Sequence, residues 1–162
     1  MHPINHFLIS FTLLFSLFSK VVSLEEIIVF SFVFGVLVDL DLIVGWLSGI
    51  KGSKVRSWFQ EPSGLVLLGF PLGVVLSLVY VDVNYILLVI IPWGSHIIAD
   101  YLAFHVVRPL APFSNKTMFI GWFKPLMHSE MKGDGRKSLS EAWVTIFISF
   151  ILVTVLLFNF VF

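Results

Sequence analysis

Five long apolar segments alternate with polar segments along the chain, and they cover residues 7–22, 27–47, 64–81, 85–107 and 142–162. About 20 consecutive apolar residues are enough for an α-helix to cross the hydrocarbon core of a bilayer. Runs this long, without strict alternation of polar and apolar positions, favour helices over strands. We therefore expect an all-α polytopic membrane protein, with about five transmembrane helices in one domain over residues 1–162.

The residues between these segments predict where the helices begin and turn. Glu25 and Glu26 suit the positive end of a helix dipole and mark the start of the second helix. Residues 82–84 predict a tight turn, and Pro92 predicts a kink in the fourth helix. Residues 138–141 have the spacing of a capping box before the last helix.

Residues 108–140 form the longest polar stretch, and it is rich in proline and glycine. Its aromatic residues would lie comfortably at the level of the lipid headgroups. We expect a structured loop here. The sequence of this stretch allows either a short interfacial helix within the loop or a plain surface loop.

Composition supports a membrane protein. Hydrophobic residues make up 58% of the chain and charged residues 12%, whereas soluble proteins have about 45–50% and about 25%. The formal net charge is zero, so no nucleic-acid partner is expected. Without cysteine there is no disulfide and no thiolate metal site.

The first apolar segment has an alternative interpretation. Residues 1–23 could be a cleaved signal peptide and not a transmembrane helix, although no Lys or Arg precedes their apolar run.

Basic residues are distributed unevenly in this predicted topology. Nine of the ten Lys and Arg residues lie on the side of the N-terminus: Lys51, Lys54, Arg56, Arg108, Lys116, Lys124, Lys132, Arg136 and Lys137. Only Lys20 lies on the other side. Because basic loops stay inside, we predict a multi-pass protein of the cell membrane, with its N-terminus cytoplasmic and its C-terminus external.

Ionisable side chains at membrane depth gather in the cytoplasmic leaflet. His96 and Asp100 are four residues apart, hence on one face of the fourth helix. Asp39 and Asp41 lie in the half of the second helix that approaches the same side. Such groups are costly in a membrane and usually have a function. The topology puts all five histidines on this side too: His2, His6, His96, His105 and His128.

These side chains suit a divalent metal ion. Imidazole and carboxylate ligands fit zinc, manganese or iron, whereas magnesium prefers oxygen ligands alone. A regular helix would hold Asp39 and Asp41 about 200° apart, so both reach one ion only if the backbone opens there. His6 could supply a ligand from the first helix. A metal held in this way could activate water for hydrolysis.

Three charged residues near helix ends are candidates for catalysis. Arg56 and Arg108 could bind a phosphate or carboxylate group by bidentate contact. Glu61 lies beside Pro62 at a predicted helix entrance.

Structural roles are open for the same residues. Asp39 could pair with Arg56 or Arg108, and Asp41 could face water. His96 and Asp100 could form a hydrogen-bonded pair between helices. Five further side chains could lie at the surface and have no part in a site: His2, His6, His105, His128 and Glu61.

The ordered polar motifs resemble those of the predicted inner-membrane metal-dependent hydrolases of the YdjM type. The matching elements are an N-terminal histidine in residues 1–6, the Asp-x-Asp of residues 39–41, the Ser-His-x-x-Ala-Asp of residues 95–100, and a proline-bearing stretch over residues 108–113. The resemblance covers most of the chain. It implies that His6, Asp39, Asp41, His96 and Asp100 are metal ligands.

The chain departs from the family in one place. The family has a His-Arg followed by Thr-His-Ser between its second and third helices, where this chain reads Val55-Arg56-Ser57-Trp58-Phe59-Gln60-Glu61-Pro62. Arg56 matches the arginine, both histidines are absent, and Glu61 is a candidate replacement for one of them.

We therefore expect a membrane-bound, metal-dependent hydrolase of an ester or phosphoester, with a lipid or other membrane-accessible substrate. Two alternatives remain open from the sequence. One is a proton- or cation-coupled transporter that uses Asp39, Asp41, His96 and Asp100 as a relay. The other is a membrane scaffold without enzymatic activity, with residues 108–140 as its binding surface.

Overall fold

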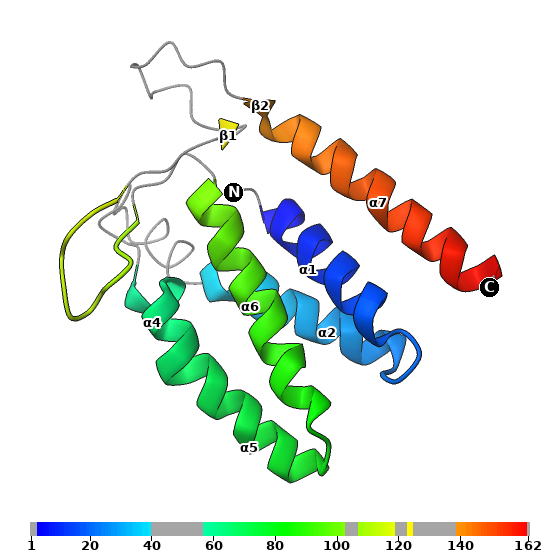
Figure 1. Cartoon of the computed structure of the whole chain (residues 1–162), viewed down its shortest axis with the longest axis horizontal. Helices are drawn as coiled ribbons and strands as arrows, with labels where there is room; N and C mark the ends of the chain where they lie inside the picture. Colours follow the sequence, from blue (N-terminus) through cyan, green and yellow to red (C-terminus); the bar gives the residue numbers. More distant parts are fainter. Residues whose placement is uncertain (1–2, 40–56, 103–106, 119–122, 125–138, 162) are drawn as a thin grey trace.

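The computed structural model describes residues 3–39, 57–102, 107–118, 123–124 and 139–161. Most of these residues are helical, which confirms the all-α prediction for this part of the chain (Figure 1). The longer helices are α1 (Pro3–Phe18), α2 (Leu24–Gly35), α5 (Phe70–Tyr80), α6 (Asn84–Leu102) and α7 (Glu141–Val161). Helix α6 packs against α1, α2 and α5, and α7 packs along the outer side of α1 (Figure 1).

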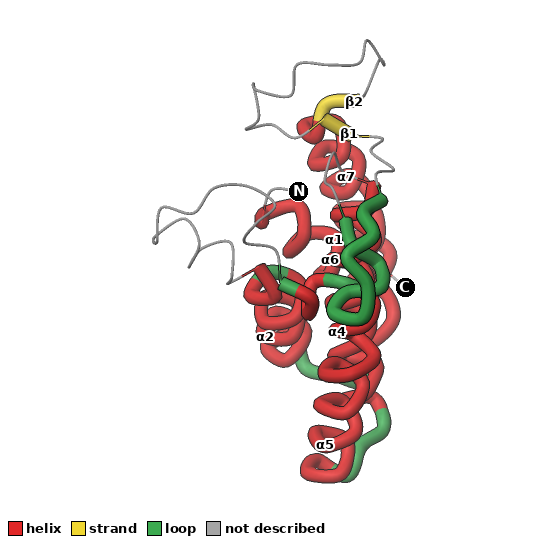
Figure 2. Tube along the Cα trace, turned by 90° about the vertical axis from the view of Figure 1, so that its left-hand side faces the viewer, coloured by secondary structure: helices red, strands yellow, loops and turns green. Residues whose placement is uncertain are grey.

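Two segments have lengths and compositions that suit a membrane span. One is Pro62–Tyr80, a continuous helix made of α4 (Pro62–Gly64), a π-helical turn (Leu65–Gly69) and α5; the other is α6. Both are 19 residues long. Figure 2 shows α5 reaching well beyond the end of α2. Many apolar side chains on α5 are exposed, such as Leu78 at 74% and Val79 at 67%, as expected of a helix whose outer face needs lipid.

Helix α2 is shorter than the sequence predicts. The apolar run continues to residue 47, but α2 ends at Gly35 and is followed by the 3₁₀ turn η1 (Leu37–Asp39). The helix begins as its glutamates indicate, with a capping box in which Ser23 and Glu26 bond each other's backbone N–H groups. The sequence analysis did not identify this box. The backbone thus leaves the regular α-helix before Asp39, and Asp41 lies outside the described residues.

The packed interior consists of two adjoining clusters of apolar side chains. Leu14 and Ile27 belong to the first, together with Leu88 from α6. The second contains Val38 and, from α6, Trp93. Because Val38 directly precedes Asp39, the second cluster borders the polar site.

The end of α5 confirms the predicted turn. Val81 ends the helix in the left-handed conformation (φ 55°), and the Asp82 carboxylate accepts a hydrogen bond of 2.9 Å from the Asn84 backbone N–H. This local bond stabilises the reversal between α5 and α6.

Residues of the polar stretch after α6 form short extended pairs where the structure describes them. Val107 and Met118 form an antiparallel bridge, and the two-residue strands β1 (Phe123–Lys124) and β2 (Leu139–Ser140) pair in parallel. The described part, residues 107–118 and 123–124, contains no interfacial helix. Helix α7 begins at Glu141, directly after β2; the proposed capping box at residues 138–141 lies partly outside the described residues.

Candidate metal centre

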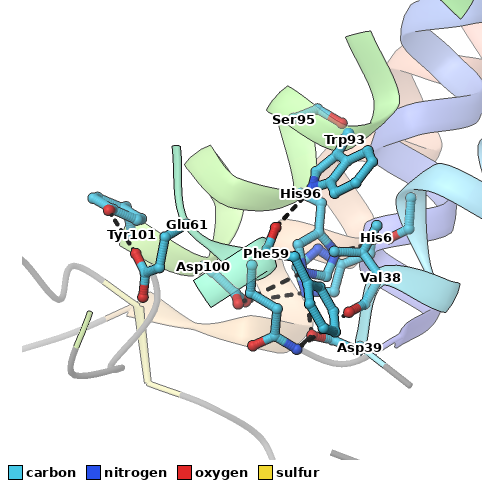
Figure 3. A network of polar contacts seen from close by, with 12 residues as sticks. His6, Val38, Asp39, Phe59, Glu61, Trp93, Ser95, His96, Asp100 and Tyr101 are labelled. Carbon is cyan, nitrogen blue, oxygen red and sulfur yellow. Dashed lines mark hydrogen bonds and ion pairs between the residues drawn. The ribbon is translucent and has the colours of Figure 1, made fainter. Parts of the chain in front are cut away.

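Four ionisable side chains meet where the ends of several helices come together (Figure 3). His6 lies in the first turns of α1, Asp39 in η1 after α2, and His96 and Asp100 near the end of α6. His6 and His96 are fully buried, Asp100 is 2% exposed and Asp39 8%. Residues separated by more than 90 positions in the sequence therefore share one site.

The distances within this group are short. His6 Nε2 lies 3.2 Å from Asp100 Oδ1, and His96 Nε2 lies 3.2 Å from Asp39 Oδ1 and 3.7 Å from Asp100 Oδ2. The two imidazole rings stack with their centroids 4.0 Å apart. One ligand atom each from His6, His96 and Asp100 can be chosen so that all three lie within 4.8 Å of one another.

One hydrogen bond indicates which nitrogen of His96 carries a proton. Its Nδ1 lies 2.8 Å from the carbonyl oxygen of Gly35. Because a carbonyl oxygen can only accept, Nδ1–H is the donor. A neutral His96 therefore presents the lone pair of Nε2 to the carboxylates, in the arrangement that backbone carbonyls impose on metal-binding histidines.

The ring nitrogens that face the carboxylates are not satisfied by hydrogen bonds. Both nitrogens of His6 and Nε2 of His96 are buried, and none makes a hydrogen bond within the described residues. The contacts at 3.2 Å therefore lack the alignment of an N–H with its acceptor. Leaving a buried polar group unpaired costs about 1–3 kcal/mol. The cluster is arranged more like a set of ligands than like a hydrogen-bond network.

A divalent metal ion fits the site. Zinc bonds of about 2.0–2.1 Å place neighbouring ligand atoms of a tetrahedron about 3.3 Å apart, close to the two 3.2 Å separations. Two imidazoles and carboxylate oxygens form a donor set that suits zinc, manganese or iron. The buried group of His6, His96 and Asp100 could hold such an ion.

The remaining candidates have other positions. Glu61 is fully buried at the start of α4, which contradicts the option that it is solvated. Its Oε2 accepts a 2.8 Å hydrogen bond from the Tyr101 hydroxyl, and its Oε1 accepts one of 2.9 Å from the backbone N–H of Arg108. The other candidates lie outside the described residues, namely His2, Asp41, Arg56 and His128. His105 also lies outside them.

Gln60 is the site residue that the sequence analysis missed. It is fully buried, and its side-chain N–H group donates to Asp39 Oδ1 over 2.7 Å. Glutamine is neither titratable nor a common metal ligand, so a search for ligand types passes over it. Its place in a polar loop next to Glu61 and Pro62 was the only available signal.

Small residues bring the helices of the site close together. A Cβ atom on Gly35 would lie 2.4 Å from Ser10 Oγ, so α1 and α2 approach closely at this point. Ser10 Oγ also lies 3.1 Å from Ser95 Oγ on α6. This three-helix contact lies one turn from His6 on α1 and directly beside His96 on α6, and it fixes the separation of the elements that carry the ligands.

Comparison of the chain with protein-family models, with curated proteins and with solved structures finds no match.

Proposed function

We propose that this protein is a membrane-bound, metal-dependent hydrolase of an ester or phosphoester. The observation that carries the proposal is the buried group of His6, His96 and Asp100, with Asp39 beside it. Both ring nitrogens of His6 and Nε2 of His96 make no hydrogen bond among the described residues. The resemblance of the motif order to that of the YdjM-type hydrolases favours the same function.

In this proposal the chain crosses the membrane about five times, with residues 108–140 on the cytoplasmic side. Two segments of suitable length and composition and the exposed apolar side chains of α7 support it, among them Phe147 at 65% and Phe150 at 70%. The site would then lie near the cytoplasmic surface, where a lipid or another membrane-accessible ester could reach it.

The side chains have distinct parts in this function. His6, His96 and Asp100 hold the ion, and Gly35 keeps the Nε2 lone pair of His96 available through its bond to Nδ1. The negative charge of two neighbouring carboxylates, Asp39 and Asp100, favours a divalent cation. The bound ion would supply a Lewis acid that polarises the scissile group and lowers the pKa of a water molecule.

A hydrolysis assay with matched variants tests the proposal. Protein purified in detergent and loaded with Zn²⁺ or Mn²⁺ is incubated with chromogenic carboxylic and phosphoric esters. We expect hydrolysis that a chelator abolishes. Asp100→Asn should lower it about 100-fold or more, because Asp100 is a proposed ligand of the ion and the loss of even an outer group around a metal costs about 10–100-fold. Asp82→Asn, which changes a carboxylate in the turn before α6, is the control and retains activity.

Absence of hydrolysis in the metal-loaded wild type across both ester classes would count against the proposal. Equal activity in wild type and Asp100→Asn would show that any hydrolysis observed arises elsewhere.

A further inference from the structure

Two neighbouring buried side chains, Gln60 and Glu61, lie between the metal centre and the end of α6. Gln60 Nε2 lies 2.7 Å from Asp39 Oδ1 and 3.3 Å from the backbone carbonyl oxygen of Val38. The same Asp39 oxygen lies 3.2 Å from His96 Nε2. Gln60 thus holds the carboxylate that faces the ring nitrogen of His96, as well as the backbone that carries it.

Glu61 attaches this segment to a second place in the fold. Its carboxylate accepts hydrogen bonds from Tyr101 and from the backbone N–H of Arg108. Tyr101 directly follows Asp100 in the sequence. The hydrogen bond from Tyr101 to Glu61 therefore links the segment of Gln60 and Glu61 to the end of α6 that carries Asp100. These bonds hold the backbone next to Gln60 in place beside α6.

The backbone that presents these two side chains is itself fixed. Trp93 on α6 donates from Nε1 to the Phe59 carbonyl oxygen over 3.1 Å. Gly64 lies so close to Phe59 that a Cβ atom there would be 2.2 Å from Phe59 Cα. The turn η3 (Trp58–Gln60) is therefore held against both α6 and α4.

We propose that Gln60, held in place by Glu61, is a positioning residue that orients Asp39 as a further ligand of the divalent cation. This inference rests on the proposed function and names a residue for the same site. An amide suits this role because it donates a hydrogen bond without adding positive charge. A lysine or arginine would neutralise Asp39 and compete with the cation, whereas the amide leaves the carboxylate its charge.

Cobalt(II) binding to the full-length protein in detergent tests the inference. Co²⁺ is titrated into the metal-free protein and followed by its visible d–d absorption, and the melting temperature of the metal-free form is measured beside it. Gln60→Met retains the length of the side chain and removes its N–H donor. Ser31→Ala is the control, because Ser31 is equally buried and its hydroxyl donates to the carbonyl oxygen of Ile27 one turn away in the same helix.

We expect Gln60→Met to weaken Co²⁺ binding by about 10–100-fold, the usual effect of losing a group that orients a metal ligand. The d–d spectrum should shift, because the Asp39 oxygen leaves its position. Glu61→Gln should weaken binding in the same direction and by less, because an amide cannot accept both bonds as well as a carboxylate does. Ser31→Ala should bind Co²⁺ as the wild type does.

The outcomes separate this inference from the proposed function. Binding of Co²⁺ by Gln60→Met with the affinity and spectrum of the wild type would overturn the role of Gln60 and leave the metal site standing. No binding by the wild type would overturn the metal site itself. If Gln60→Met does not yield folded protein, Gln60→Asn gives the same readout, since its amide is one methylene too short to reach Asp39.

Discussion

Replacing Gly35 by alanine perturbs the crossing of α1 and α2 and the support of His96 at the same time. The new methyl group would lie 2.4 Å from Ser10 Oγ and 2.8 Å from Ser10 Cβ, where ordinary contacts are 3.4–4 Å. Ser10 is fully buried and its hydroxyl lies 3.1 Å from Ser95 Oγ, so it has no free space to enter. The helices must therefore separate by about an ångström.

The structure sets the size of the effect. Overpacking a closely packed interior costs about 1–3 kcal/mol. A chain of this length loses about 2–4 °C of melting temperature per kcal/mol. Separation of the helices also moves the Gly35 carbonyl away from His96 Nδ1, with which it now forms a 2.8 Å bond. We therefore expect Gly35→Ala to lower both the melting temperature and the affinity for Co²⁺.

A compensating substitution identifies the cause. Ser10→Gly removes the atoms with which the methyl group clashes, at its own cost of about 1 kcal/mol for glycine within a helix. The double variant should then be more stable than the sum of the single effects predicts, by about 1 kcal/mol or more. Melting curves of the four proteins in one detergent give this coupling. Wild-type stability of Gly35→Ala, or purely additive effects, would refute the close-packing argument.

Three further predictions concern other parts of the chain. The Tyr85 hydroxyl and Ser23 hydrogen-bond Glu26 and lower the pKa of its carboxyl below the usual 4.5. This stabilisation is therefore present at neutral pH and lost as pH falls below about 4.5 through the lowered value; the difference in melting temperature between wild type and Tyr85→Phe should shrink over that range. Leu88→Ala, at a fully buried position between α1 and α2, should cost about 2–5 kcal/mol in chemical unfolding. Thr145→Val removes the 2.6 Å bond to Asn5 Oδ1 and should make α7 more susceptible to proteolysis, with a loss of about 1 kcal/mol in stability.

Local signals in the sequence were sufficient for much of the fold. The apolar runs predict the helices, and α6 and α7 begin within one residue of their predicted starts. The turn at Asp82 was predictable because its carboxylate bonds a backbone group two residues away. The end of α2 at Gly35 was not, because the apolar composition continues past it and the close contact with Ser10 is a tertiary effect.

The sequence predicts which residues could be metal ligands, but not the hydrogen bonds that hold those ligands in place. Spacing places His96 and Asp100 on one face of a helix, and the topology brings His6 and Asp39 to the same end. The bond from His96 to the Gly35 carbonyl and the bond from Gln60 to Asp39 join residues 61 and 21 positions apart, respectively. Neither bond leaves a pattern along the chain. The same is true of Glu61, a charged residue that the fold buries against Tyr101.

The metal content of the purified protein tests the central claim most directly. Elemental analysis by mass spectrometry compares the wild type with His96→Ala and Asp100→Asn, and with Asp82→Asn as the control. The account predicts at least one equivalent of zinc, manganese or iron per chain in the wild type and in Asp82→Asn, and loss of that metal in both site variants. A folded wild type that holds no such metal after loading, or site variants that retain it in full, would contradict the account.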